Sequence, residues 1–154
     1  MRALCLIAVA YLGGCASDGT ESDRTEAGYE ALRDGEYKNA LAHFDAARER
    51  AELLPPEYVE LSVARCQALA HISASSAVSE LISLGTYATE KDYSFVLCDL
   101  RDKDERSLEL IDAGLSLYPD SSALEALREV TLDRMAQNAE ARANMTKFRC
   151  IAYI

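Results

Sequence analysis

One cysteine near the start of the chain stands where a thiol could be chemically modified. Cys15 follows Gly13 and Gly14, and these follow an apolar run from Ala3 to Leu12. The run has the length of the apolar region of a signal peptide and is too short to cross a bilayer as a helix. We therefore expect residues 1–14 to be a signal peptide and Cys15 to be the residue that is modified.

In the sequence Leu12-Gly13-Gly14-Cys15 the chain resembles bacterial lipoproteins. The resemblance implies that a peptidase cuts before Cys15 and that acyl chains, palmitate among them, are attached to this cysteine. Stable anchoring takes two or more such chains, because one acyl chain holds a protein only marginally. Ala16 follows where an aspartate would retain a lipoprotein at the inner membrane, so we expect a periplasm-facing protein at the outer membrane. The alternative is an ordinary secretory signal with a chance cysteine.

Three further cysteines would remain in this oxidising compartment, Cys66, Cys98 and Cys150. An odd number permits at most one internal disulfide. Cys66 and Cys98 fall at near-equivalent places in neighbouring helices, but an offset of one residue turns the two side chains by about 100°. We expect buried free thiols, and a bond between Cys66 and Cys98 is the alternative.

No combination of residues in the sequence builds a recognisable catalytic or metal site. His43 and His71 come without an HExxH motif, a Cys-x-x-Cys pair or a third ligand at helical spacing. Nucleophile motifs and a glycine-rich phosphate loop are also absent from the sequence. The acidic stretch 99–106 lacks the glycine of a calcium loop, and we expect Asp102 or Asp104 to cap a helix. We expect no enzymatic activity, no metal and no cofactor.

Charge narrows the choice of partner. The formal net charge is −10, and residues 1–14 carry one arginine and no acid, so their removal leaves 15 basic and 26 acidic residues, or −11. An excess of this size repels nucleic-acid phosphates and anionic headgroups and favours basic protein surfaces. We expect no nucleic-acid partner.

Composition divides the rest of the chain into a tether and one domain. Residues 17–23 are small, polar and acidic, so we expect a flexible tether over 15–24. Residues 25–154 suffice for one domain with a core. Glycine and proline are scarce there, and apolar residues recur at steps of three and four. These patterns predict an all-α fold.

The first expected helix pair carries a regular set of small and aromatic residues. Tyr37, Ala40, Phe44 and Ala47 follow one another at steps of three and four, as one face of an amphipathic helix requires. In the pattern Gly28-x6-Gly35-x-Tyr37-x2-Ala40-x3-Phe44-x2-Ala47 the chain resembles a tetratricopeptide repeat, a helix-turn-helix unit of 34 residues.

The resemblance implies a role for each of these residues. Gly28 and Ala40 would let two antiparallel helices approach closely, Gly35 would permit the tight turn, and Tyr37 and Phe44 would fill the space between helices. The chain departs from the usual pattern of the repeat at Ala31, where a tyrosine is usual, and at Pro55, which would end the second helix three residues late.

A second copy of the closing half lies further along the chain, as Ser107-x3-Ile111-x2-Gly114-x4-Pro119. It begins 67 residues after Ala40, one residue short of two repeat lengths. The recurrence predicts a degenerate repeat between the two copies, over about 55–85. Two apolar rows there predict a helix packed on both sides. One row is Leu61, Ala64 and Ala68, and the other is Val59, Val63, Cys66 and Ala70.

We expect three repeats and a fourth helix pair to the C-terminus, opened by a capping box over 120–125. No single pair can bury its own apolar face, so the pairs should stack as a solenoid. The alternative is a generic helical bundle with a chance spacing. The apolar ending 148–154 would either fold back on the last repeat or form a contact surface.

A stack of this kind presents a groove lined by the first helix of each pair, which the family resemblance makes a docking surface for a protein or peptide. One subclass binds a C-terminal carboxylate through a lysine and an asparagine, but Thr25 and Tyr29 stand at those places. The sequence therefore favours a scaffold or adaptor, for example in assembly of an envelope complex. The expected groove residues are Tyr29, Arg33, Val63, Gln67, Tyr93 and Asp99.

The alternative function is an envelope enzyme or small-ligand carrier. Its site would form between helices from scattered carboxylates such as Glu80, Glu90 and Asp92. Nothing in the sequence places a nucleophile or base beside them.

Overall fold

The computed structural model describes residues 21–50, 55–100 and 103–151. These form α1 (Glu21–Arg33), α2 (Tyr37–Arg50), α3 (Pro55–Ile72), α4 (Ala74–Leu84), the 3-10 turn η1 (Gly85–Tyr87), α5 (Glu90–Asp99), α6 (Asp104–Leu117) and α7 (Ser122–Ile151). The part of the chain that is described contains no strand, and the predicted all-α fold is confirmed. The signal peptide, Leu12, Gly13, Gly14 and Cys15 lie outside the described residues, as do the side chains beyond Ala141.

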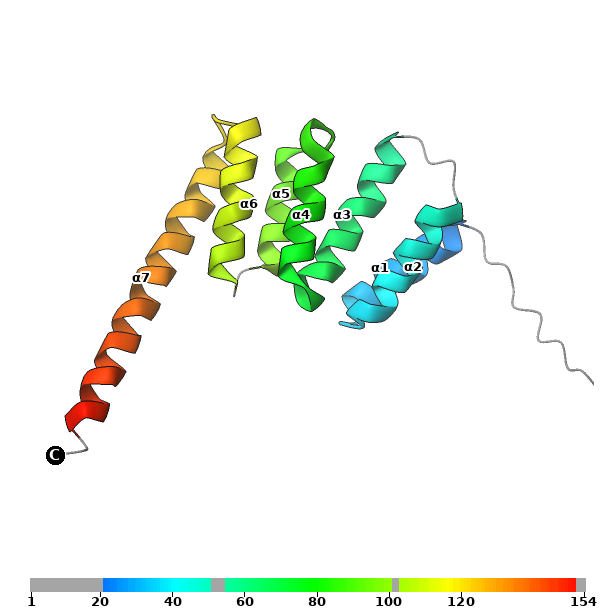
Figure 1. Ribbon diagram of the computed structural model, residues 1–154. Coiled ribbons are helices and arrows are strands. Elements are labelled where there is room, and N and C mark those ends of the chain that lie inside the picture. Colours follow the sequence, from blue (N-terminus) through cyan, green and yellow to red (C-terminus); the bar gives the residue numbers. More distant parts are fainter. Residues whose placement is uncertain (1–20, 51–54, 101–102, 152–154) are drawn as a thin grey trace, which may run out of the picture.

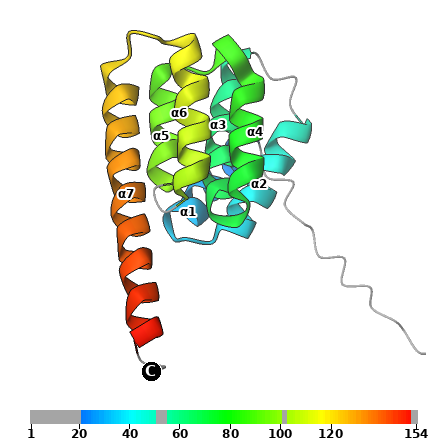
Figure 2. The same cartoon turned by 60° about the vertical axis from the view of Figure 1, so that its left-hand side comes forward.

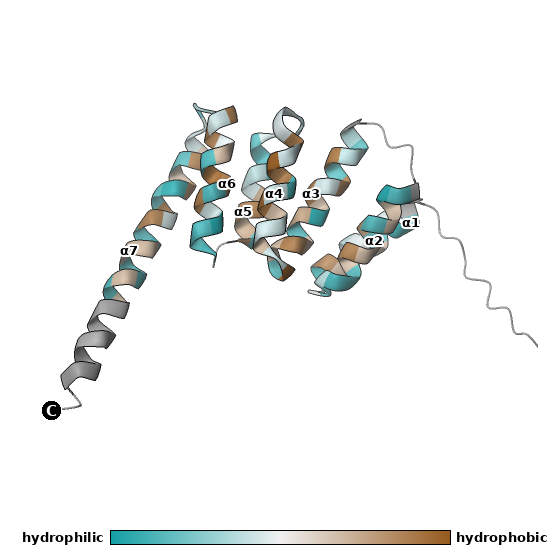
Figure 3. Ribbon diagram, viewed as in Figure 1, coloured by the Kyte–Doolittle hydropathy of each residue, from teal (hydrophilic) through white to brown (hydrophobic). Residues whose placement is uncertain are grey.

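The helices pack in sequential pairs that stand side by side in one row (Figure 1). Helix α1 packs on α2, α3 on α4, and α5 on α6, while α7 packs on α6. Contacts of α2 with α3, of α3 with α5 and of α4 with α6 join each pair to the next. Because a short connection returns the chain along its own path, each pair is antiparallel. Apolar residues concentrate where neighbouring helices face each other (Figure 3).

In the first pair, two helices meet at a glycine and a phenylalanine. Phe44 is fully buried, and a Cβ atom on Gly28 would lie only 2.5 Å from its Cε1 atom. The turn between α1 and α2 has Gly35 at φ +79°, a backbone conformation that glycine adopts without strain. The Gly35 N–H donates to the carbonyl of Leu32, and the Glu36 N–H to that of Ala31, which is the hydrogen-bond pattern of a Schellman motif.

The third pair repeats this arrangement with different residues. Ser107, Ile111 and Gly114 of α6 are buried at the places that Ala40, Phe44 and Ala47 hold on α2. The Ser107 hydroxyl donates to the Leu100 carbonyl at 3.0 Å. A Cβ atom on Gly114 would lie 2.9 Å from a methyl carbon of Leu124 and 3.0 Å from the Tyr93 ring. Pro119 lies exposed in the turn that leads to α7.

Helix α3 joins the two halves of the core, and both of its predicted apolar rows are buried apart from Val59, which is partly buried. Leu61, Ala64 and Ala68 belong to a cluster with Ala40, Phe44 and Ala47 of α2. Val63, Cys66 and Ala70 belong to the larger cluster formed with α4, α5 and α6. The predicted helix with two packed sides is confirmed.

Two predicted boundaries are wrong. Helix α1 begins at Glu21, so the last four residues of the expected tether, 21–24, are helical. The expected fourth pair is replaced by α7, a single helix of 30 residues. No glycine or proline occurs after Pro119 to end it. At about 1.5 Å per residue, α7 extends far past α6, as Figure 2 shows.

Helix α7 starts within the stretch predicted for it but shows only the serine half of the expected capping box, and the start of α6 differs from the prediction. The Ser121 hydroxyl oxygen accepts the Leu124 N–H at 3.1 Å and so caps α7. Lys103 precedes α6 and makes no side-chain capping bond, whereas Asp104 binds Arg134 of α7. The expectation that Asp104 caps α6 is wrong, and Asp102 lies outside the described residues. Within the residues described, no helix combines the length and the apolar content that a bilayer crossing requires.

The contact between Gly28 and Phe44 predicts the effect of a larger residue. We expect Gly28→Val to lower the free energy of unfolding by about 2 kcal/mol, because the added methyl groups overlap the Phe44 ring. Ala42→Val, at an exposed position of α2, should cost about 0.5 kcal/mol from helix propensity. In the Phe44→Leu background the cost of Gly28→Val should shrink. Urea denaturation measures each value, and full additivity of the two changes would contradict this contact.

Candidate functional site

A groove runs between the first helices of the three pairs. It has a volume of about 590 Å³ and is bounded by α1, α3, η1 and α5. Contacts of α3 with α1 and with α5 place these three helices on one side of the molecule. The lining residues are Tyr29 of α1; Pro56, Val59, Glu60, Val63, Ala64 and Gln67 of α3; Tyr87 of η1; and Thr89, Asp92 and Phe95 at α5.

Helix α3 forms the floor of the groove through residues spaced three and four apart. Val59, Val63 and Gln67 follow at steps of four, so their side chains share one face of the helix. This face overlaps the edges of the two buried rows, since Val63 belongs to one and the lining residue Ala64 to the other. The floor of the groove is thus formed where the two packed sides of α3 meet.

Three aromatic side chains stand on the walls of the groove and are exposed. The exposed fractions are 36% for Tyr29, 45% for Phe95 and 70% for Tyr87. The Tyr29 ring meets Phe44 edge to face, with 5.3 Å between the ring centroids. Packing of this kind holds the ring at the groove wall.

The polar groups of the groove include two carboxylates, Glu60 and Asp92. The Tyr29 hydroxyl lies 3.4 Å from Glu60 Oε1, to which it donates. Burial, and next the Glu60 charge, raises the pKa of Tyr29 to about 12, so the phenol stays a neutral donor at physiological pH. The Thr89 N–H and hydroxyl both donate to Asp92 Oδ2 at 2.7 Å, and this fixes the start of α5.

The structure brings together only some of the groove residues expected from sequence. Tyr29, Val63 and Gln67 line the groove. Arg33 is not a lining residue and lies 3.8 Å from Glu30 in an exposed ion pair. Asp99 does not line the groove either, and it accepts from Gln67 at 3.3 Å.

The expectation that Tyr93 faces the groove is wrong. Its ring is 0% exposed and contacts Tyr118 edge to face. Helix α5 presents Asp92 and Phe95 to the groove, and successive helical residues are turned by about 100°. Tyr93 therefore faces α6.

The sequence contained a partial signal for two of the missed residues, Asp92 and Phe95. Cys66 and Cys98 are 32 residues apart, and the same offset relates Glu60 to Asp92. It also relates Val63 to Phe95, and both members of these two pairs line the groove. The offset would have placed Phe95 correctly, although it also pairs Gln67 with Asp99, which does not line the groove. Tyr87, in the η1 turn, has no counterpart to signal it.

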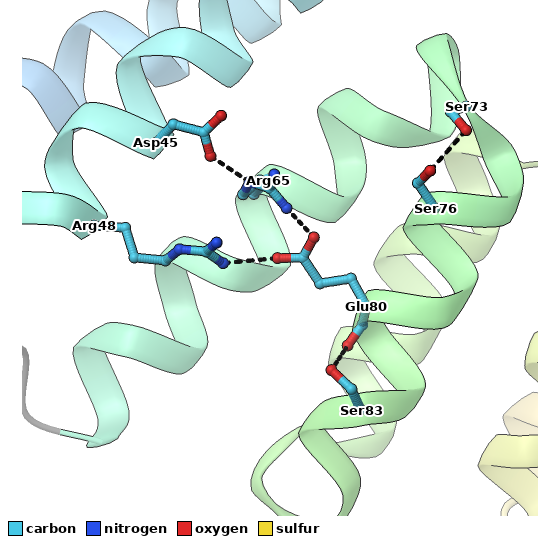
Figure 4. Close-up of polar contacts among 7 residues, drawn as sticks. All are labelled: Asp45, Arg48, Arg65, Ser73, Ser76, Glu80 and Ser83. Atoms are coloured by element: carbon cyan, nitrogen blue, oxygen red, sulfur yellow. Dashed lines mark hydrogen bonds and ion pairs between the residues drawn. The ribbon is translucent and has the colours of Figure 1, made fainter.

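The carboxylates of the alternative function do not converge on one pocket. Asp92 is on the groove, whereas Glu90 accepts a hydrogen bond from Ser121 at 2.6 Å. Glu80 accepts from Arg48 at 2.9 Å and from Arg65, and Arg65 also binds Asp45 (Figure 4). This ion-pair network joins α2, α3 and α4. The Glu80 carboxylate thus binds Arg48 of α2 and Arg65 of α3 and connects helices.

Histidines and cysteines also stand apart from the groove. The His71 ring stacks on Tyr37 with 3.8 Å between centroids and its Nε2 atom lies 3.2 Å from Asp99. Among the described residues no three His, Cys, Asp or Glu side chains are grouped to hold a metal. Cys66 and Cys98 are both free, with Cys66 buried and Cys98 exposed. The expectation of burial is therefore wrong for Cys98.

Comparison of the chain with protein-family models, with curated proteins and with solved structures found no match.

The ion-pair network predicts a measurable loss of stability. The Glu80 side chain is 18% exposed. Exposed ion pairs contribute about 0–1 kcal/mol, and disruption of buried pairs costs about 3–5 kcal/mol, so the cost of losing this partly buried pair should fall between the two ranges. We expect Glu80→Gln to lower the free energy of unfolding by about 1–2 kcal/mol in urea denaturation. Asp112, which pairs with Arg128 and is 60% exposed, supplies the control Asp112→Asn, with an expected cost of about 0.5 kcal/mol or less. Equal losses for the two variants would contradict a role for the network.

The two free thiols should differ in reactivity. Burial, with a smaller contribution from the Glu80 charge, raises the pKa of the Cys66 thiol to about 12. Because the thiolate is the reactive form, about one Cys66 thiol in 10⁴ would be ionised at pH 8. We expect iodoacetamide at pH 8 to alkylate Cys98 in the folded protein and Cys66 only in denaturant, as measured by peptide mass spectrometry. Rapid alkylation of Cys66 under native conditions would show that its burial is wrong.

Proposed function

We propose that this chain is a lipid-anchored cell-envelope protein with tetratricopeptide-like repeats, and that it acts as a scaffold or adaptor by holding a segment of a partner protein. The observation that carries the proposal is the groove with three exposed aromatic side chains, Tyr29, Tyr87 and Phe95. Exposed aromatic residues around a concave apolar surface are typical of sites where proteins bind one another.

The size and shape of the groove suit a peptide segment. A volume of about 590 Å³ is within the range of sites that enclose a small ligand or several side chains. Aromatic anchors contribute most of the energy of such contacts when a partner excludes water from them. Val59 and Val63 on the floor add an apolar surface between the aromatic walls.

The sequence before α1 supports a place at a membrane. Cys15 follows Leu12-Gly13-Gly14 and an apolar run, as in lipoprotein precursors. Acylation of Cys15 would attach the folded part to the outer membrane with the groove in the periplasm. A scaffold at that place would act on an envelope complex.

Site-specific photo-crosslinking in intact cells tests this proposal. Benzoylphenylalanine is placed at Tyr87 or at Phe95 in the groove, and at Leu117 as an exposed control outside it. We expect both groove positions to give one crosslinked product, identified by mass spectrometry as the same envelope protein, and we expect none from Leu117. The product should weaken when Tyr29→Ala removes the aromatic ring from the opposite wall. Equal products from all three positions, or none from the groove, would argue against a docking site there.

A further inference from the structure

The charged side chains that line the groove are carboxylates, and the Lys91 ammonium lies beside one wall, 5.2 Å from the centroid of the Phe95 ring. Glu60 on α3 and Asp92 at α5 are the charged lining residues, and no lysine, arginine or histidine lines the groove in the part of the chain that the structure describes. Glu80 offers a contrast, since Arg48 and Arg65 both bind it. The groove can therefore offer the carboxylates of Glu60 and Asp92 to a bound partner.

The Glu60 carboxylate is placed to receive a donor from a bound partner. It is exposed, it forms no ion pair among the described residues, and its contact with the Tyr29 hydroxyl is long, at 3.4 Å. A partner that covered the groove with purely apolar side chains would remove water from this charge and leave it unpaired, at a cost in affinity. The groove thus favours an occupant that brings a positive charge to Glu60.

The aromatic walls favour the same kind of occupant. The face of an aromatic ring attracts a cation, and the Lys91 ammonium already lies 5.2 Å from the centroid of the Phe95 ring. A guanidinium group can stack on a ring while its N–H groups donate to a carboxylate. Tyr29 and Glu60, which touch each other across α1 and α3, supply one ring and one carboxylate at adjacent places.

We propose that the occupant is a segment of a partner protein in which an arginine is flanked by apolar side chains. This inference rests on the proposed docking function and specifies the chemistry of the partner. The guanidinium binds Glu60 and the Tyr29 ring, and the apolar neighbours pack on Val63 and Phe95. An acidic segment is repelled by Glu60 and Asp92 and by a chain whose net charge is −10.

Peptide selection followed by affinity measurement tests the inference. The purified full chain is immobilised and used to select binders from a phage library of random twelve-residue peptides. We expect enrichment of arginine next to leucine, isoleucine, valine or aromatic residues. The best peptide and its citrulline analogue, in which the guanidinium charge is removed, are then titrated by fluorescence polarisation.

Variants of the chain distinguish recognition of the arginine charge from binding of any peptide in the groove. Glu60→Gln should weaken the arginine peptide about tenfold, as expected for loss of a charged hydrogen bond, and should leave the citrulline peptide almost unchanged. Glu129→Gln, an exposed position on α7 with the same change in net charge, should leave both peptides unaffected. Phe95→Ala, which removes an aromatic wall without changing the charge, should weaken every peptide bound in the groove. Circular dichroism checks that each variant is folded.

Each result decides between the two proposals. If peptides bind through Phe95 but lack arginine, or if Glu60→Gln acts no more strongly than Glu129→Gln, the charge inference is overturned and the docking function stands. If no selected peptide is weakened by Phe95→Ala, the groove is not a docking site and both proposals fail.

Discussion

Helix α3 has to bury two sides at once, and this constraint sets the arrangement of the rest of the molecule. One side packs against α2 through Leu61, Ala64 and Ala68, and another packs against the later helices through Val63, Cys66 and Ala70. Two of the three residues on the first side are alanines, which leaves room for the Phe44 ring in the same buried cluster. The floor of the groove is formed where these two sides meet, by Val63 and Ala64 together with the more exposed Val59 and Gln67.

The charged residues fall into two groups, arginines that join helices and acidic residues that line the groove. Arginines are used to join helices outside the groove: Arg48 and Arg65 tie α2, α3 and α4 together, and Arg134 ties α7 to α6. The chain has 16 basic residues against 26 acidic ones, so arginines used as connections leave acidic residues elsewhere without a cation. Glu60 and Asp92 are two of these, and packing puts both on the groove. The surface charge of the groove is therefore linked to how the stack is held together.

Features with a local cause could be predicted from the sequence, and features that depend on helix rotation could not. The turn at Gly35, the cap at Ser121 and the two rows of α3 follow from backbone freedom, hydrogen bonding and periodicity within a few residues. The rotation of α5 was predicted wrongly because Tyr93 and Phe95 are both large and aromatic, and the 32-residue offset that favours Phe95 also favours Asp99, which lies off the groove. The long α7 was missed because a repeating pattern suggested another turn where the chain contains no residue to make one.

The early start of α1 limits where the groove can work. Under the proposed attachment at Cys15, only residues 16–20 separate the acylated cysteine from Glu21, and five residues span about 18 Å even when fully extended. The first turn of α1 would then lie within about this distance of the lipid headgroups. A segment displayed by another protein on the same membrane would meet the groove at a high effective concentration, so a weak contact would suffice for capture.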